Sequence, residues 1–98
     1  METDYEIRIP SQVVHNKNLS DSAKLLYGYI DQTRRNNCSL VTNKELAKVM
    51  KVGERSIRRW ISELKKENFI LAEEEIINGV KRRTLYLKFY LSEKERWK

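Results

Sequence analysis

Apolar side chains recur every three or four positions in three stretches of the chain, which is the spacing that places them on one face of an α-helix. The first stretch predicts a central helix over residues 20–35, with Ser20 as its N-cap and Asp21 in its first turn. The pair Asn36-Asn37 is predicted to end this helix. Its wide apolar face comprises Ala23, Leu26, Tyr27 and Ile30, with Leu25 and Tyr29 at the margins.

Two shorter helices are predicted over residues 42–50 and 53–67, joined by a tight connector at 51–53. Thr42 and Glu45 have the spacing of a capping box, in which each side chain accepts a hydrogen bond from the backbone of the other residue. Val41 and Leu46 have the spacing of a hydrophobic staple around this helix start, and Gly53 is suited to cap the second helix. The inward faces comprise Leu46, Ala47 and Met50 in the first helix and Ile57, Trp60, Ile61 and Leu64 in the second.

Beyond Asn68, which suits the left-handed position that ends a helix, two β-prone runs span residues 70–77 and 80–91. The Asn78-Gly79 pair between them is the strongest short signal for a β-hairpin. This two-residue turn opposes unlike charges in two cross-strand pairs, Glu75 with Arg82 and Glu74 with Arg83. Alternate side chains of the second run are apolar and are predicted to point inward: Leu85, Leu87, Phe89 and Leu91.

A short strand is also predicted near the N-terminus, where Tyr5, Ile7 and Ile9 alternate with polar residues before Pro10. The resulting order is strand, three helices and a hairpin, with a tight turn between the last two helices. This order predicts an α+β fold of the winged helix-turn-helix kind. A length of 98 residues suits a single domain over 1–98, with a core at about 5–91.

The net charge of +6 is concentrated in two blocks of the sequence. Residues 1–33 have a net charge of −2, whereas residues 51–66 carry +4 and residues 81–98 carry +5. Such blocks release counterions from a polyphosphate and therefore favour nucleic acid as the partner. A solvated surface that only maintains solubility is the alternative that charge alone leaves open.

The helix predicted at 53–67 turns its cationic side chains away from its apolar face. Arginine can bind guanine through two hydrogen bonds, and lysine or serine can reach phosphates or base edges. We therefore expect this helix to enter the major groove of double-stranded DNA, although an ordinary soluble helix can also carry a basic face. Its candidate DNA-binding residues are Arg55, Ser56, Arg58, Arg59, Ser62 and Lys66.

The hairpin is a candidate wing, because Lys81, Arg82 and Arg83 directly follow its turn. Cross-strand pairing with Glu74 and Glu75 is expected to restrain Arg82 and Arg83, which leaves Lys81 as the main phosphate contact. The glutamates and the apolar residues Ile76, Ile77 and Val80 favour the alternative, a hairpin that packs against protein. Asn43 and Lys44, at a helix N-terminus, either hold a phosphate or serve only in capping.

Residues 43–60 resemble a helix-turn-helix, with Lys51 at the turn position where the motif usually has glycine. A closer resemblance is carried by Ile9-Pro10, Leu19-Ser20, Ala23–Ile30, Asn43–Ala47, Ser56–Ile61 and Leu64. Over about residues 5–91 the chain resembles the winged-helix N-terminal domain of plasmid, phage and mobile-element replication initiators from Gram-positive bacteria. The resemblance implies binding to repeated sites at a replication origin, commonly as a homodimer. In such initiators a further C-terminal region often recruits host replication proteins, which are therefore candidate partners.

Residues suited to catalysis are scarce. The single histidine, His15, and the single cysteine, Cys38, build neither a zinc site nor a disulfide, and the three glycines form no phosphate-cradling loop. We therefore expect a protein without enzymatic activity, cofactor, metal or small-molecule substrate. No apolar run approaches the roughly 20 residues that span a bilayer. With no secretory signal at the start, the sequence indicates the cytoplasm and no membrane partner, and the resemblance implies a bacterial host.

Two other functions remain compatible with the sequence. One is transcriptional repression, which uses the same DNA-binding chemistry. The other is a winged helix that binds protein through an apolar surface of Ile76, Ile77, Val80 and Trp97. The same apolar residues, together with the resemblance, motivate the prediction of a dimer on an inverted repeat.

Overall fold

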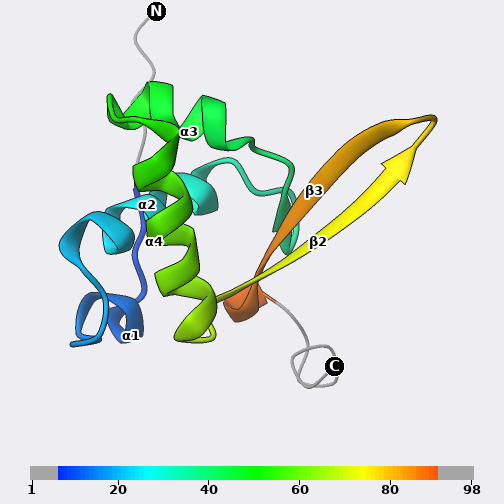
Figure 1. Cartoon of the computed structure of the whole chain (residues 1–98). Coiled ribbons are helices and arrows are strands. Elements are labelled where there is room, and N and C mark those ends of the chain that lie inside the picture. The colour runs from blue at the N-terminus through cyan, green and yellow to red at the C-terminus, as the bar shows by residue number, and fades with distance from the viewer. Residues whose placement is uncertain (1–6, 91–98) are drawn as a thin grey trace, which may run out of the picture.

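The computed structural model describes residues 7–90, in which the helices gather on one side of a long two-stranded ribbon (Figure 1). The helices within this range span Ser11–Val14 (α1), Asp21–Gln32 (α2), Asn43–Met50 (α3) and Glu54–Lys66 (α4). The strands span Cys38–Ser39 (β1), Ile70–Ile77 (β2) and Val80–Leu87 (β3), and a 3₁₀ turn follows at Lys88–Tyr90. No helix of the described range is long and apolar enough to cross a membrane.

Helix α2 begins at its predicted cap but ends before the predicted Asn36-Asn37. Ser20 Oγ accepts a hydrogen bond from the first turn, as expected for an N-cap. Thr33 is already the C-cap, because its hydroxyl contacts both the Ile30 carbonyl (2.8 Å) and the Ser39 hydroxyl of β1 (2.7 Å). These contacts draw the chain out of the helix and toward the sheet.

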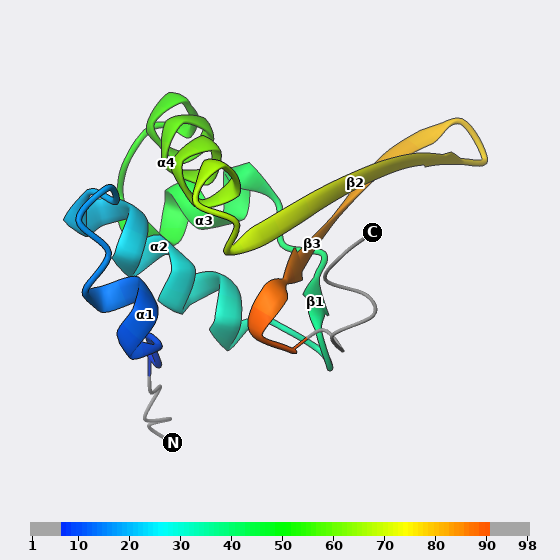
Figure 2. The ribbon, with the colours of Figure 1, turned by 90° about the horizontal axis from the view of Figure 1, so that it is seen from below.

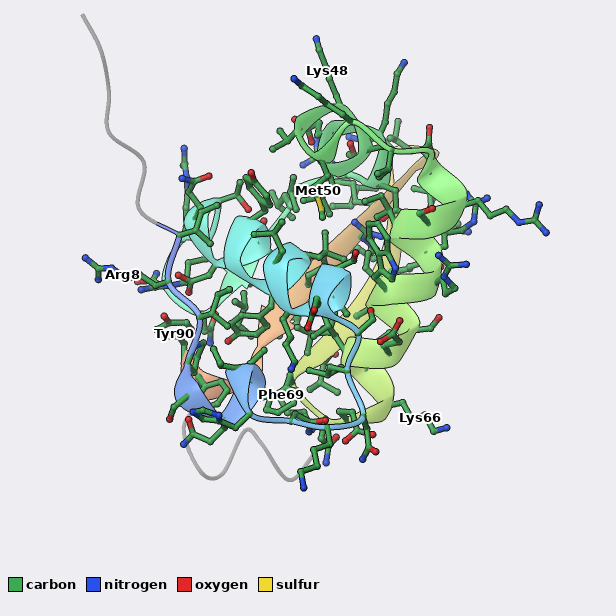
Figure 3. The ribbon with its side chains drawn as sticks, turned by 90° about the vertical axis from the view of Figure 1, so that its left-hand side faces the viewer. Arg8, Lys48, Met50, Lys66, Phe69 and Tyr90 are labelled. Atoms are coloured by element: carbon green, nitrogen blue, oxygen red, sulfur yellow. The ribbon has the colours of Figure 1, made fainter. Side chains whose placement is uncertain are left out.

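The core lies where α2, α3 and α4 meet the base of the ribbon. It contains every residue predicted for the inward face of α4: Ile57, Trp60, Ile61 and Leu64. Leu25 was predicted to widen the buried face of α2, but its side chain is 42% exposed, because no element of residues 7–90 covers this margin of the helix. Figure 3 shows Met50 between α3 and α2, whereas Lys48 and Lys66 project outward.

The sheet is antiparallel, with strand order β1-β3-β2. Asn78 and Gly79 adopt positive φ angles of 53° and 78°, as the predicted two-residue turn requires. The predicted register is confirmed, because Glu75 pairs with Arg82 and Glu74 pairs with Arg83. The ribbon of β2, β3 and their turn is called the wing below, and Figure 2 shows it extending well beyond the helices.

The expected N-terminal strand is wrong for the residues that the structure describes, since residues 7–10 form no strand. Tyr5 lies outside the described range. The third strand of the sheet is instead β1, which pairs with Tyr86 and Leu85 of β3. Ile7 and Ile9 still point inward, because they pack on Gly28 of α2, where an added Cβ would overlap Ile7.

Strand β3 ends at Leu87, earlier than the predicted boundary at Leu91, which lies outside the described range. Phe89 was predicted as an inward strand position. In the structure it belongs to the 3₁₀ turn and stacks on Phe69, with ring centroids 5.9 Å apart and Tyr27 edge-on to both rings. The apolar pattern therefore correctly predicted that the Phe89 ring packs against the core, where it is partly buried, although the backbone there is no longer part of the sheet.

Candidate nucleic-acid interface

The turn between α3 and α4 keeps the compact shape of a helix-turn-helix although it lacks the usual glycine. Lys51 itself adopts the left-handed conformation, with φ 59° and ψ 45°, and the Val52 amide donates to the Ala47 carbonyl (3.0 Å). The left-handed region disfavours residues that carry a Cβ. The lysine side chain is exposed at this turn, so the conformation meets no steric barrier beyond that of its own backbone.

Helix α4 is oriented by its buried face. Its apolar side chains are anchored in the core, and Gly53 caps its start as predicted. Because one face is buried, the opposite face meets solvent, and it carries the exposed residues Arg55, Arg58, Arg59, Ser62 and Lys66. Within residues 7–90 none of these four cations takes part in an ion pair, so their charges are available to a partner. Ser56 is half-buried on the edge of this face.

The start of α3 has the predicted capping box. The Thr42 hydroxyl accepts from the Glu45 amide (3.1 Å), and the Glu45 carboxylate accepts from the Thr42 amide (2.9 Å). These bonds hold the pKa of Glu45 below its usual value. Among the described residues the amides of Asn43 and Lys44 have no intramolecular acceptor, so the helix start keeps two donors directed outward.

Arg83 connects the wing to this helix start. Its guanidinium donates to the Asn43 side-chain oxygen and to the Val41 carbonyl (2.7 Å). The side chain is half-buried, and this desolvation lowers the pKa of Arg83. Arg83 and Asn43 were both predicted as DNA contacts, and the structure brings their side chains into contact with each other at the lining of the groove described below.

The other two cations of the wing remain exposed. Lys81 Nζ lies 3.4 Å from Glu74 Oε1 in an ion pair, while Arg82 forms no ion pair within the described residues. The strand register is as predicted, but the expected ion pairs are wrong for the described residues: Glu74 forms its ion pair with Lys81 rather than Arg83, and Arg82 forms none. The reason is the short reach of the carboxylate, which meets the flexible lysine diagonally once Arg83 has turned toward α3.

An open groove separates the wing from the starts of α3 and α4. Its lining includes Leu40 and Val41, which precede α3, and Glu54 at the first position of α4. Its cationic lining comprises Lys44, Lys81, Arg82 and Arg83, against the two carboxylates Glu54 and Glu74. Leu40 was not among the residues singled out from the sequence, because an isolated leucine beside a capping box carries no signal of exposure.

The arrangement of two turn-linked helices, an exposed cationic second helix and a flanking β-ribbon defines the winged helix-turn-helix class. The chain belongs to the helix-turn-helix domain family, whose model matches residues 17–70. The matched segment runs from the residues before α2 to the first residue of β2 and so includes the whole helix-turn-helix. No curated protein and no solved structure shows a significant match to the chain. Family membership indicates DNA as the partner.

Proposed function

We propose that the protein binds double-stranded DNA in a sequence-specific manner, with α4 in the major groove. The observation that carries this proposal is the solvent-exposed face of Arg55, Arg59, Ser62 and Lys66, held opposite a buried apolar face. A recognition helix contacts base edges mainly through its N-terminal half. Arg55 and Arg59 occupy that half, and Lys66, in the last turn, is placed for a phosphate.

Phosphate contacts flank the helix on the side of the wing. The groove between the wing and α3 is lined by Lys44, Lys81 and Arg82, and by Asn43, whose amide, like that of Lys44, has no acceptor among the described residues. The DNA strand that separates the major from the minor groove would pass along this groove. Such contacts fix the position of the protein on the duplex but carry no base information. In this arrangement Arg83 and Asn43 hold the wing at its angle rather than contact DNA.

We further propose that the target is a replication origin of a plasmid, phage or mobile element. Support comes from the resemblance of Ala23–Ile30 and Ser56–Ile61 to replication initiators of that kind. The test is to incubate the protein with fragmented bacterial, plasmid and phage DNA and to sequence what is retained. Repeated sites at origins would support the proposal, and enrichment of promoter sites would contradict it.

The class of function is tested by the dependence of affinity on salt. Each phosphate contact adds about 0.9 to the slope of log affinity against log salt for duplex DNA. We expect a steep slope with random duplex and tighter binding to the retained site. A variant with Arg8→Ala is the matched control, because Figure 3 shows Arg8 on the side of the domain opposite α4. A flat slope for the unaltered chain would exclude DNA as the partner.

A further inference from the structure

The tip of the wing, residues 76–80, exposes three large aliphatic side chains. Their exposed fractions are 73% for Ile76, 43% for Ile77 and 58% for Val80. Figures 1 and 2 show this tip projecting away from every helix, so no other part of residues 7–90 covers it. The surface next to it along the wing belongs to the groove that we assign to a DNA strand.

The apolar side chains are distributed over both faces of the ribbon. Directly paired residues of an antiparallel ribbon share a face, and successive pairs alternate. The pair of Ile76 with Lys81 lies on the inner face, which continues from the buried Leu85 and Leu87. The next pair, Ile77 with Val80, lies on the outer face. A protein surface or a second copy that packs against one face of the ribbon would leave the apolar residues of the opposite face in water. A narrow groove that receives the tip would cover both faces.

Each face of the ribbon carries one cationic side chain next to the apolar tip. Lys81 is on the inner face and Arg82, paired with Glu75, is on the outer face. The minor groove of DNA has the complementary cross-section, with base edges at its floor and phosphates along both rims. The ion pair of Lys81 with Glu74 joins two side chains that are 69% and 56% exposed. Exposed pairs of this kind are weak, so a phosphate can replace the glutamate.

We propose that the wing tip enters the minor groove as a two-sided apolar wedge and bends the DNA. Lys81 and Arg82 then meet the phosphates of the two rims. This inference rests on the proposed function, because α4 must first place the wing beside the duplex. The minor groove is only about 6 Å wide. The backbones of the two strands alone are about 4.8 Å apart, so the ribbon with its side chains must widen the groove. Apolar wedges in the minor groove unstack base steps and bend the duplex by about 20–90°.

The test is a measurement of bend angle, by energy transfer between dyes at the two ends of a duplex that carries the retained site. The wedge variant combines Ile76→Thr, Ile77→Thr and Val80→Thr, which keeps β-branched side chains and the charge of the wing. The control is Val14→Thr, an aliphatic residue about as exposed as Ile77, on α1, which lies far from the wing tip in Figure 1. We expect the unaltered chain and the control to bend the duplex. The wedge variant should lose the bend and bind more weakly, although it keeps every cation of the unaltered chain.

Different results separate the wedge from the proposed function. Binding by the unaltered chain without a bend, or an equal bend by the wedge variant, would overturn the wedge and leave α4 as the reader of the site. A free chain that sediments as a dimer and becomes monomeric in the wedge variant would also overturn it, by assigning the tip to a second copy. Failure of the unaltered chain to bind any duplex would instead overturn the proposed function, and the wedge with it.

Discussion

Arg83 of the wing donates a hydrogen bond to the side-chain oxygen of Asn43 at the first position of α3. The second arm of the same guanidinium holds the Val41 carbonyl, one residue before the capping box. Two donors of a planar group thereby fix the wing against the helix-turn-helix in both distance and angle.

We predict that Arg83→Ala and Asn43→Ala weaken DNA binding through the same interaction. A double-mutant cycle should therefore show coupling of about 0.5–3 kcal/mol, as contacting residues do. If Arg83 acts only as a positioning residue, the salt slope of Arg83→Ala stays that of the unaltered chain. Removal of Arg82, with its side chain exposed, should lower the slope by about 0.9. A slope that falls for Arg83→Ala, together with additive losses, would show instead that Arg83 contacts a phosphate directly.

Arg55→Ala and Arg59→Ala test the recognition helix. Each should cost about 1–3 kcal/mol of affinity for the retained site and relax the preference at one base pair, because a bidentate arginine contact is lost. Competition among single-base variants of the site measures both effects, and circular dichroism verifies the fold. The control Arg8→Ala should leave both the affinity and the base preference unchanged. Full affinity in both α4 variants, with the fold intact, would remove α4 from the interface.

Leu64 is fully buried at the junction of α4 with the rest of the core. Leu64→Ala should lower the free energy of unfolding by about 2–5 kcal/mol, because it removes buried methyl groups and leaves a cavity. The matched substitution Leu25→Ala, on the exposed margin of α2, should change it by no more than about 0.5 kcal/mol. Urea unfolding followed by far-ultraviolet circular dichroism measures both. Equal effects would mean that the two leucines are buried alike.

Gly28 is the point where residues 7–9 lie against α2. Gly28→Ala should destabilise the fold by about 1–3 kcal/mol, because the new Cβ overlaps Ile7 and outweighs the helix propensity of alanine. Adding Ile7→Ala should restore part of the loss, since it vacates the space that the Cβ needs. If Gly28→Ala is stabilising, the N-terminal segment does not pack on α2 in solution.

Sequence periodicity predicted most of the helical framework and the whole register of the wing. The capping box at Thr42 and Glu45 and the Asn78-Gly79 turn succeeded because each depends on residues that are neighbours in the sequence. The N-terminal strand failed for the opposite reason. Alternation shows which side chains point inward, but the strand with which a segment pairs depends on residues far away in the sequence. Here β1 occupies the edge of β3.

The sequence could predict which residues form the exposed face of α4 but not the contacts between the wing and α3. The exposed face of α4 follows from helical phase alone, and its exposure is confirmed. The contact between Arg83 and Asn43 joins residues 40 positions apart, and no local pattern reports it. For the same reason the sequence could not show which wing cation is held by Glu74, because that depends on where Arg83 points.

The strand order has a consequence for the solubility of the protein. β1 covers only the base of β3, and the free side of β2 has no neighbour in the described chain, so the outer wing presents unpaired backbone along both edges. Such edges are templates on which other copies can add strands and start aggregation. Glu73, Glu74 and Glu75 occupy the middle of β2. In any parallel, in-register stack of β2 strands, identical carboxylates would lie about 4.8 Å apart and repel one another. The charge of the three glutamates therefore disfavours strand-by-strand association through the exposed ribbon.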